Sequence, residues 1–84
     1  TKEDYRQARR EANALSRLRR RHEELETQIE AAENDLKMLS EGITAAGESG
    51  NVALVEELGG KYKQIDESLK ALWLEWEDIS EKMT

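Results

Sequence analysis

The chain has 84 residues, 38% of them charged, and it contains no cysteine and no proline. A chain of this length forms at most one domain with a thin core, which argues against an enclosed catalytic pocket, and the lack of cysteine excludes disulfides and thiolate zinc sites. The net charge of −6 hides a strong asymmetry: residues 1–22 carry eight basic and three acidic side chains, a balance of +5, and the remaining residues carry five basic and sixteen acidic ones, a balance of −11.

Residues 1–14 are predicted to form a basic N-terminal extension that overhangs the rest of the domain. The steps from Ala12 to Leu15 and from Leu15 to Leu18 are both three residues long, a stammer in the heptad pattern. The second predicted helix also ends too early to pair with this extension, because its last seam residue, Met83, already faces Leu15. An unpartnered helix this short is equally compatible with a frayed or linker-derived extension.

Two long helices are predicted, over residues 15–45 and 51–83, joined by a turn over residues 46–50. Apolar or aromatic side chains recur in both segments at alternating three- and four-residue steps, the a/d seam of a left-handed coiled coil. The turn contains glycines that tolerate positive φ, and Asn51 is a suitable N-cap for the second helix. The two stripes consist of Leu15, Leu18, His22, Leu25, Ile29, Ala32, Leu36, Leu39 and Ile43, and of Val55, Leu58, Tyr62, Ile65, Leu69, Leu72, Trp76, Ile79 and Met83.

The register of the two stripes predicts that the chain folds back on itself. With the turn centred near residues 48 and 49, every layer of one stripe meets a layer of the other, for example His22 with Trp76. Arg21 and Glu75 then occupy facing positions beside the seam and should lie close together. The predicted fold class is all-α, a single two-helix antiparallel coiled-coil hairpin.

Glycines mark the ends and one weak point of these helices. Gly42 and Gly47 are candidate terminators of the first helix. Gly59 and Gly60 lie inside the second helix, where each costs roughly 1 kcal/mol relative to alanine. The heptad phase continues through this pair, so we expect a weakened helix there and no second break.

The basic side chains near the N-terminus lie on one helical face. At 100° per residue they fall within a sector of about 120°, opposite the seam, and only Arg19 lies outside it. Arginine forks match phosphate oxygens, so this face suits a nucleic-acid backbone, although a solvated outer face also has to be polar. The predicted nucleic-acid-binding residues are Lys2, Arg6, Arg9, Arg10, Arg17, Arg20 and Arg21.

Three other residues are candidate sites outside the basic face. Trp73 and Leu74 are expected at positions that a lone hairpin exposes, and they form the candidate protein-docking spot, although Trp73 can also lie over the edge of the seam. His22 has too few neighbouring ligands for a metal site, and we expect it to be a packed layer residue. No metal site is predicted.

Catalytic signatures are missing from the sequence. A superficial similarity to the end of a phosphate-binding loop is found at Gly59, Gly60 and Lys61. The first glycine of such a loop and the serine or threonine after its lysine are both missing. The glutamate clusters belong to solvated helix faces, where no cleft tunes a pKa. We therefore expect this chain to be non-catalytic, with no small-molecule substrate and no cofactor.

The stretch from Leu69 to Ile79 resembles the end of the C-terminal coiled-coil domain of ABC-F ATPases of the Uup type. The match consists of the pattern Leu72-Trp73 followed by Trp76-Glu77, while Tyr5-Arg6 and the run from His22 to Glu26 are similar to the first helix of that domain. The sequence departs from the family where a proline is often found, with Ser16 in that neighbourhood, and Gly59-Gly60 is unusual.

This resemblance implies a cytoplasmic domain appended to ATP-binding cassettes of the same polypeptide, with ATP bound in the parent protein and no membrane span. It also implies binding to DNA or ribosomal RNA. The chain begins with Thr1, and we expect it to be excised from a larger protein. The alternative expectation is a structural, oligomerising or protein-docking hairpin that binds no nucleic acid.

Overall fold

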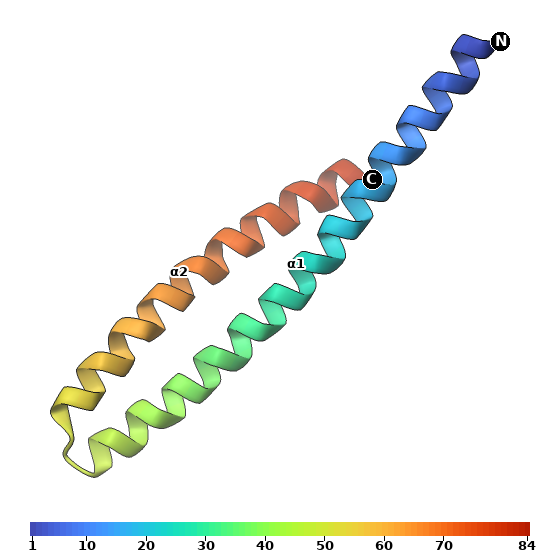
Figure 1. Cartoon of the computed structure of the whole chain (residues 1–84). Coiled ribbons are helices and arrows are strands. Elements are labelled where there is room, and N and C mark those ends of the chain that lie inside the picture. Colours follow the sequence, from blue (N-terminus) through green and yellow to red (C-terminus); the bar gives the residue numbers. More distant parts are fainter.

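The computed structural model describes all 84 residues and consists of two helices, α1 (Lys2–Glu48) and α2 (Val52–Met83). They lie side by side as an antiparallel hairpin, with α1 continuing well beyond the end of α2 (Figure 1). The molecule measures 73 × 16 × 14 Å. The predicted all-α helical hairpin is confirmed. Neither helix contains a stretch both long and apolar enough to cross a lipid bilayer.

Helix α1 begins with a capped first turn. The Thr1 hydroxyl accepts a hydrogen bond from the backbone N–H of Asp4 at 3.2 Å, which satisfies one of the free donors of the first turn. Glu3 and Asp4 place negative charge at the positive end of the helix dipole. The helical backbone therefore starts at Lys2 and runs without interruption through the predicted extension.

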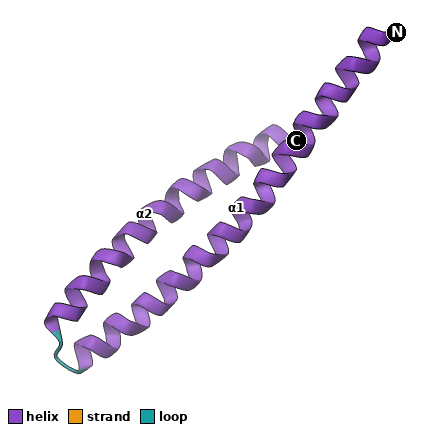
Figure 2. Ribbon diagram, viewed as in Figure 1, coloured by secondary structure: helices purple, strands orange, loops and turns teal.

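The turn is shorter than the sequence indicated, because α1 continues to Glu48 instead of ending near Ala45. Gly50 has φ +72°, its N–H donates to the Gly47 carbonyl at 3.1 Å, and the Asn51 N–H donates to the Ala46 carbonyl at 2.9 Å. This pair of bonds defines a Schellman motif with glycine at the left-handed position. Figure 2 shows how little of the chain lies outside the helices.

Gly42 does not terminate α1. A Cβ atom at this position would lie 3.1 Å from Cδ1 of Leu58 on α2, so the glycine allows the two helices to approach closely. Ala46, one turn further on, is only 3% exposed. The seam therefore extends one layer closer to the turn than the predicted stripe, which ended at Ile43.

Helix α2 starts as predicted and passes through its two glycines. The Asn51 side-chain oxygen accepts a hydrogen bond from the Leu54 N–H at 3.1 Å, the expected N-cap contact. Gly59 and Gly60 are both helical, and open space surrounds the position of a Cβ atom at each. Neither glycine is needed for packing, so each only lowers the helix propensity of α2.

The core is a single narrow seam. Only five residues are buried, and all are apolar. The other seam residues are half-buried, except Tyr62, which is 37% exposed. The predicted register is confirmed where His22 stacks on Trp76, with ring centroids 5.0 Å apart. The buried residues are Leu25, Ile29, Ala32, Ala46 and Ile79.

Candidate nucleic-acid interface and the aromatic layer

The basic face follows the part of α1 that has no partner helix and continues onto the first turns of the paired part, where Arg17 and Arg20 lie. Residues 1–13 are all exposed, and Figure 1 shows this segment projecting past the C-terminus as a single helix. Because α1 is continuous, the helical spacing of 100° per residue holds along the whole segment. The arginines that the sequence placed on one face therefore share a face in the structure.

Most of these basic side chains have no acidic partner. Arg6 lies 3.9 Å from Glu3 in an exposed pair, which contributes little. By contrast, Lys61, Lys70 and Lys82 on α2 each pair with an acid one turn away. The N-terminal basic residues that form no ion pair are Lys2, Arg9, Arg10, Arg17, Arg19 and Arg20.

Arg21 differs from the rest of the predicted face because it is bound to α2. Its Nε and Nη2 donate to the two carboxylate oxygens of Glu75 at 2.7 and 2.9 Å, and its Nη1 donates to Glu24 at 3.3 Å. The predicted proximity of Arg21 and Glu75 is confirmed. This bidentate pair occupies the guanidinium N–H groups that would otherwise bind a phosphate. Arg21 therefore belongs to the contact between the two helices and not to the free basic face.

The ion pair changes the titration of both groups. The hydrogen bonds from Arg21 hold the pKa of the Glu75 carboxyl below its ordinary value, against the opposing effect of desolvation. The same contact with Glu75 is the main reason that the pKa of Arg21 is raised. Both groups therefore stay charged at neutral pH, and the Arg21 guanidinium of α1 stays bound to Glu75 of α2.

His22 forms a polar network with side chains of both helices. Its Nδ1 lies 2.9 Å from Oε1 of Glu26, and its Nε2 lies 2.8 Å from the Ser80 hydroxyl. The same Glu26 oxygen accepts a hydrogen bond from Trp76 Nε1 at 3.4 Å. Ser80 was missed, although it lies one helical turn after Trp76 and so reaches the same layer. His22 is a half-buried layer residue, as expected.

Trp73 and Leu74 are both exposed, as predicted, but they differ in their contacts. Trp73 packs edge-on against Trp76, with ring centroids 5.4 Å apart and planes at 83°, and it lies over the edge of the seam, 39% exposed. Leu74 is 68% exposed and does not line the hollow next to Trp73. Trp73 is therefore partly held against the seam, while Leu74 is open to solvent.

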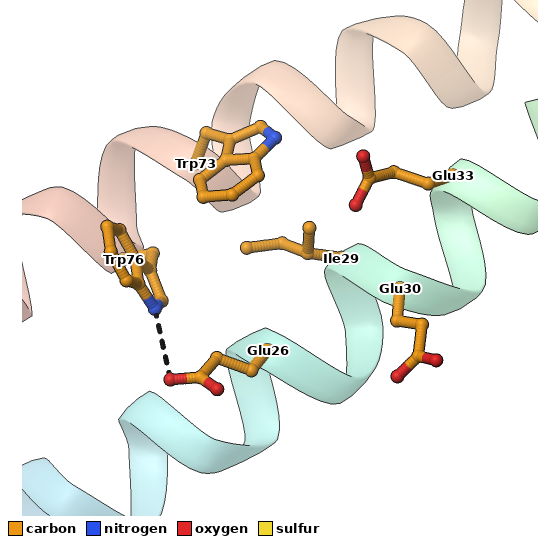
Figure 3. A pocket seen from close by; sticks show the side chains of 6 residues that line it. All are labelled: Glu26, Ile29, Glu30, Glu33, Trp73 and Trp76. Atoms are coloured by element: carbon orange, nitrogen blue, oxygen red, sulfur yellow. Dashed lines mark hydrogen bonds between the residues drawn. The ribbon is translucent and has the colours of Figure 1, made fainter.

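A hollow of about 300 Å³ lies beside the two tryptophans. Figure 3 shows Ile29 pointing from α1 towards the rings, Glu26 bonded to the Trp76 N–H, and the Glu33 carboxylate turned towards Trp73. The sequence pattern did not predict this hollow. A usable signal was present, since Glu26 and Glu33 are seven residues apart and share one heptad position at the edge of the seam.

The structure contains no group of three or more histidine or acidic residues placed to hold a metal ion. Comparisons of the chain with protein-family models, with curated proteins and with solved structures found no match.

Proposed function

We propose that the chain binds the sugar-phosphate backbone of a nucleic acid through the basic face of the N-terminal half of α1, which includes the overhang. The face consists of Lys2, Arg6, Arg9, Arg10, Arg17 and Arg20. The observation that carries this proposal is the concentration of exposed basic side chains, all but Arg6 without an acidic partner, on the N-terminal half of α1 in an otherwise acidic molecule.

The shape of this face suits a phosphate chain. From Lys2 to Arg20 it extends about 27 Å at 1.5 Å per residue, and the helix has no neighbour on any side over residues 2–13. Guanidinium groups bind phosphate oxygens with two hydrogen bonds each and keep their charge at any physiological pH. Contacts of this kind position a protein on nucleic acid without reading its sequence.

The charge of the hairpin body supports an end-on arrangement. The residues after His22 carry a balance of −11, so the body is repelled by the phosphates that attract the overhang. A nucleic acid would therefore contact the N-terminal half of α1 and leave the turn and α2 in solvent. This arrangement also agrees with the implied role as an appendage of an ABC-F ATPase, which remains a prediction from residues 69–79.

Gel-shift or fluorescence-anisotropy titrations test the proposal, with duplex DNA, single strands and structured RNA at several salt concentrations. Replacing Arg10, Arg17 and Arg20 with glutamine should weaken binding to all sequences alike. The slope of log K against log salt should fall by roughly 0.7 to 0.9 for each lost contact. Arg21 is left unchanged, because its loss would break the pair with Glu75.

A matched control removes the same charge elsewhere. Arg19, Lys37 and Lys63 are exposed, form no ion pair and lie outside the basic face, so their joint replacement by glutamine should change affinity much less. Equal losses in both triple variants would show that only net charge matters. Wild-type protein that binds no nucleic acid at low salt would refute the proposal.

The alternative function is docking to a protein through Trp73 and Leu74. It is favoured by their exposure, 39% and 68%, on a helix whose other large apolar side chains mostly face the seam. Such an interface would be much less sensitive to salt than phosphate binding. Replacing Leu74 with alanine would abolish it and leave nucleic-acid binding unchanged, which separates the two functions.

A further inference from the structure

The hollow beside Trp73 has no part in the proposed phosphate contacts, and its chemistry is the opposite of theirs. We propose that it is a binding site for an organic cation, an alkylammonium or guanidinium group, held between the indole rings and the carboxylates of α1. The proposal goes beyond nucleic-acid binding and does not depend on it.

The rings supply two walls at a right angle. The planes of Trp73 and Trp76 meet at 83° with centroids 5.4 Å apart, so a group in the corner between them can contact more than one aromatic surface. The face of a tryptophan ring attracts a cation through its quadrupole, more strongly than tyrosine or phenylalanine does. The hydrogen bond to Glu26 and the stack on His22 hold the Trp76 ring in place without a ligand.

The charges around the hollow favour a cation. It is lined by three glutamates and by no basic residue, and neither Glu30 nor Glu33 forms an ion pair. Figure 3 shows the Glu33 carboxylate on the side of the tryptophans and the Glu30 carboxylate turned away. Glu33 is therefore the carboxylate of the lining that has no ion pair and faces the rings, and phosphate groups are repelled.

The second hollow of the molecule provides an internal comparison. Its volume is similar, about 280 Å³, but Lys61 lies in its wall and no aromatic ring lines it. A cation would gain neither ring contacts nor a surplus of negative charge there. At about 300 Å³ the tryptophan hollow is at the lower limit of ligand pockets, which suits one trimethylammonium or guanidinium group and not a larger ligand.

Intrinsic fluorescence reports on the hollow directly, because the two tryptophans of the chain both line it. The full chain is titrated with choline chloride, with sodium chloride at equal ionic strength, and with 3,3-dimethylbutan-1-ol, which has the shape of choline without its charge. Choline should give a saturable change that the salt and the alcohol do not. Equal responses to choline and to the alcohol would overturn the proposal, as would a response that never saturates.

Two further probes distinguish the source of the cation. Blocked trimethyl-lysine amide and blocked arginine amide present the same chemistry on a protein side chain. Tighter binding of either amide than of choline would identify a modified or unmodified peptide as the ligand, and tighter binding of choline would identify a small molecule or a lipid headgroup. Either ranking supports a cation site, and failure of all three probes overturns it.

Variants locate the site. Trp73→Leu should weaken choline binding by about fivefold or more, since cation contacts with a ring contribute about that factor. Glu33→Gln, which keeps the shape and is not expected to disturb folding, should weaken it by about two- to threefold. Glu23→Gln removes an equal charge from α1 outside the hollow and should leave binding unchanged. Unaltered binding in the Glu33 variant, or an equal loss in the Glu23 variant, would refute the assigned position.

Discussion

At the scale of single residues, the seam is narrow enough for one side chain to decide stability. Leu25 is fully buried, and it is the only large side chain of the molecule with no measurable exposure. It lies next to the layer in which His22 stacks on Trp76. Small domains have few such contacts to lose, because their total stability is only a few kcal/mol.

Replacing Leu25 with alanine should lower the free energy of unfolding by about 2 to 5 kcal/mol, because the change removes buried methyl groups and leaves a cavity. Chemical denaturation followed by circular dichroism measures the loss. The matched control is Leu74→Ala, the same change at a position 68% exposed, which should stay within about 0.5 kcal/mol of the wild type. Similar losses in both variants would contradict the observed register.

The pair of Arg21 and Glu75 predicts a dependence of stability on pH. The pKa of Glu75 is lowered from its ordinary value of 4.5 in the folded chain, so the folded protein binds the proton less readily than the unfolded chain. The stabilisation is therefore present above about pH 4.5 and is lost as the pH falls through the lowered pKa.

Glu75→Gln should reduce the melting temperature at neutral pH and should flatten its decline on acidification. The difference from wild type should shrink below about pH 4.5 and vanish once Glu75 of the wild type is protonated. Thermal melts at a series of pH values measure this. Glu23→Gln, at an exposed position without an ion pair, should keep a constant offset from wild type, and a constant offset for Glu75→Gln would contradict the pair.

At the scale of the elements, the glycines of the chain have different roles. Gly50 needs its left-handed φ to end α1, and Gly42 allows Leu58 to approach. Gly59 and Gly60 have open space at the Cβ position and helical backbone. These two can become alanine without strain or contact, as can Gly47, which is also helical with open space at its Cβ position.

Replacing Gly59 or Gly60 with alanine should therefore raise the free energy of unfolding by about 0.4 to 1 kcal/mol each, because the unfolded chain loses freedom and the helix gains propensity. Gly50→Ala should lower it by about 1 to 2 kcal/mol, the cost of a left-handed alanine. Denaturant titrations of the three variants test the difference in sign. A stabilised Gly50 variant would show that the turn differs from the Schellman motif.

In the molecule as a whole, the overhang (residues 1–13) contributes little to the free energy of unfolding of the hairpin, although α1 is one continuous helix. Residues 1–13 are all exposed and have no α2 opposite them. A lone helix of this length is marginal in water, so the overhang depends on propagation from the paired part of α1. Binding to a nucleic acid would add the contacts that it lacks.

Deleting residues 1–13 should change the free energy of unfolding of the hairpin by no more than about 0.5 kcal/mol. In the full chain, hydrogen exchange should be fast for backbone amides over residues 5–12 and slow over residues 25–32. Addition of a bound nucleic acid should slow exchange in the first segment only. Protection of residues 5–12 in the free protein would show that the overhang packs against something, such as a second copy of the chain.

The helices, the hairpin, the register and the common face of the N-terminal arginines could all be predicted from the residue pattern. Heptad spacing is a local repeat, and two repeats that agree layer by layer leave only one pairing, so His22 met Trp76 as predicted. The end of α1 was less predictable, since a glycine can terminate a helix or lie within it. Contact with Leu58 decided that Gly42 lies within it.

The contacts of the side chains beside the seam could not be predicted from the residue pattern, because they depend on how the two helices pack. Arg21 has the helical position of a free basic residue, and a neighbour 54 residues away binds its guanidinium. Trp73 and Leu74 are adjacent in sequence, yet the first turns over the seam beside Trp76 and the second stays in solvent. The direction of a long side chain depends on the partner that the other helix brings to it, and that partner is specified by the pairing of the helices and not by the local spacing.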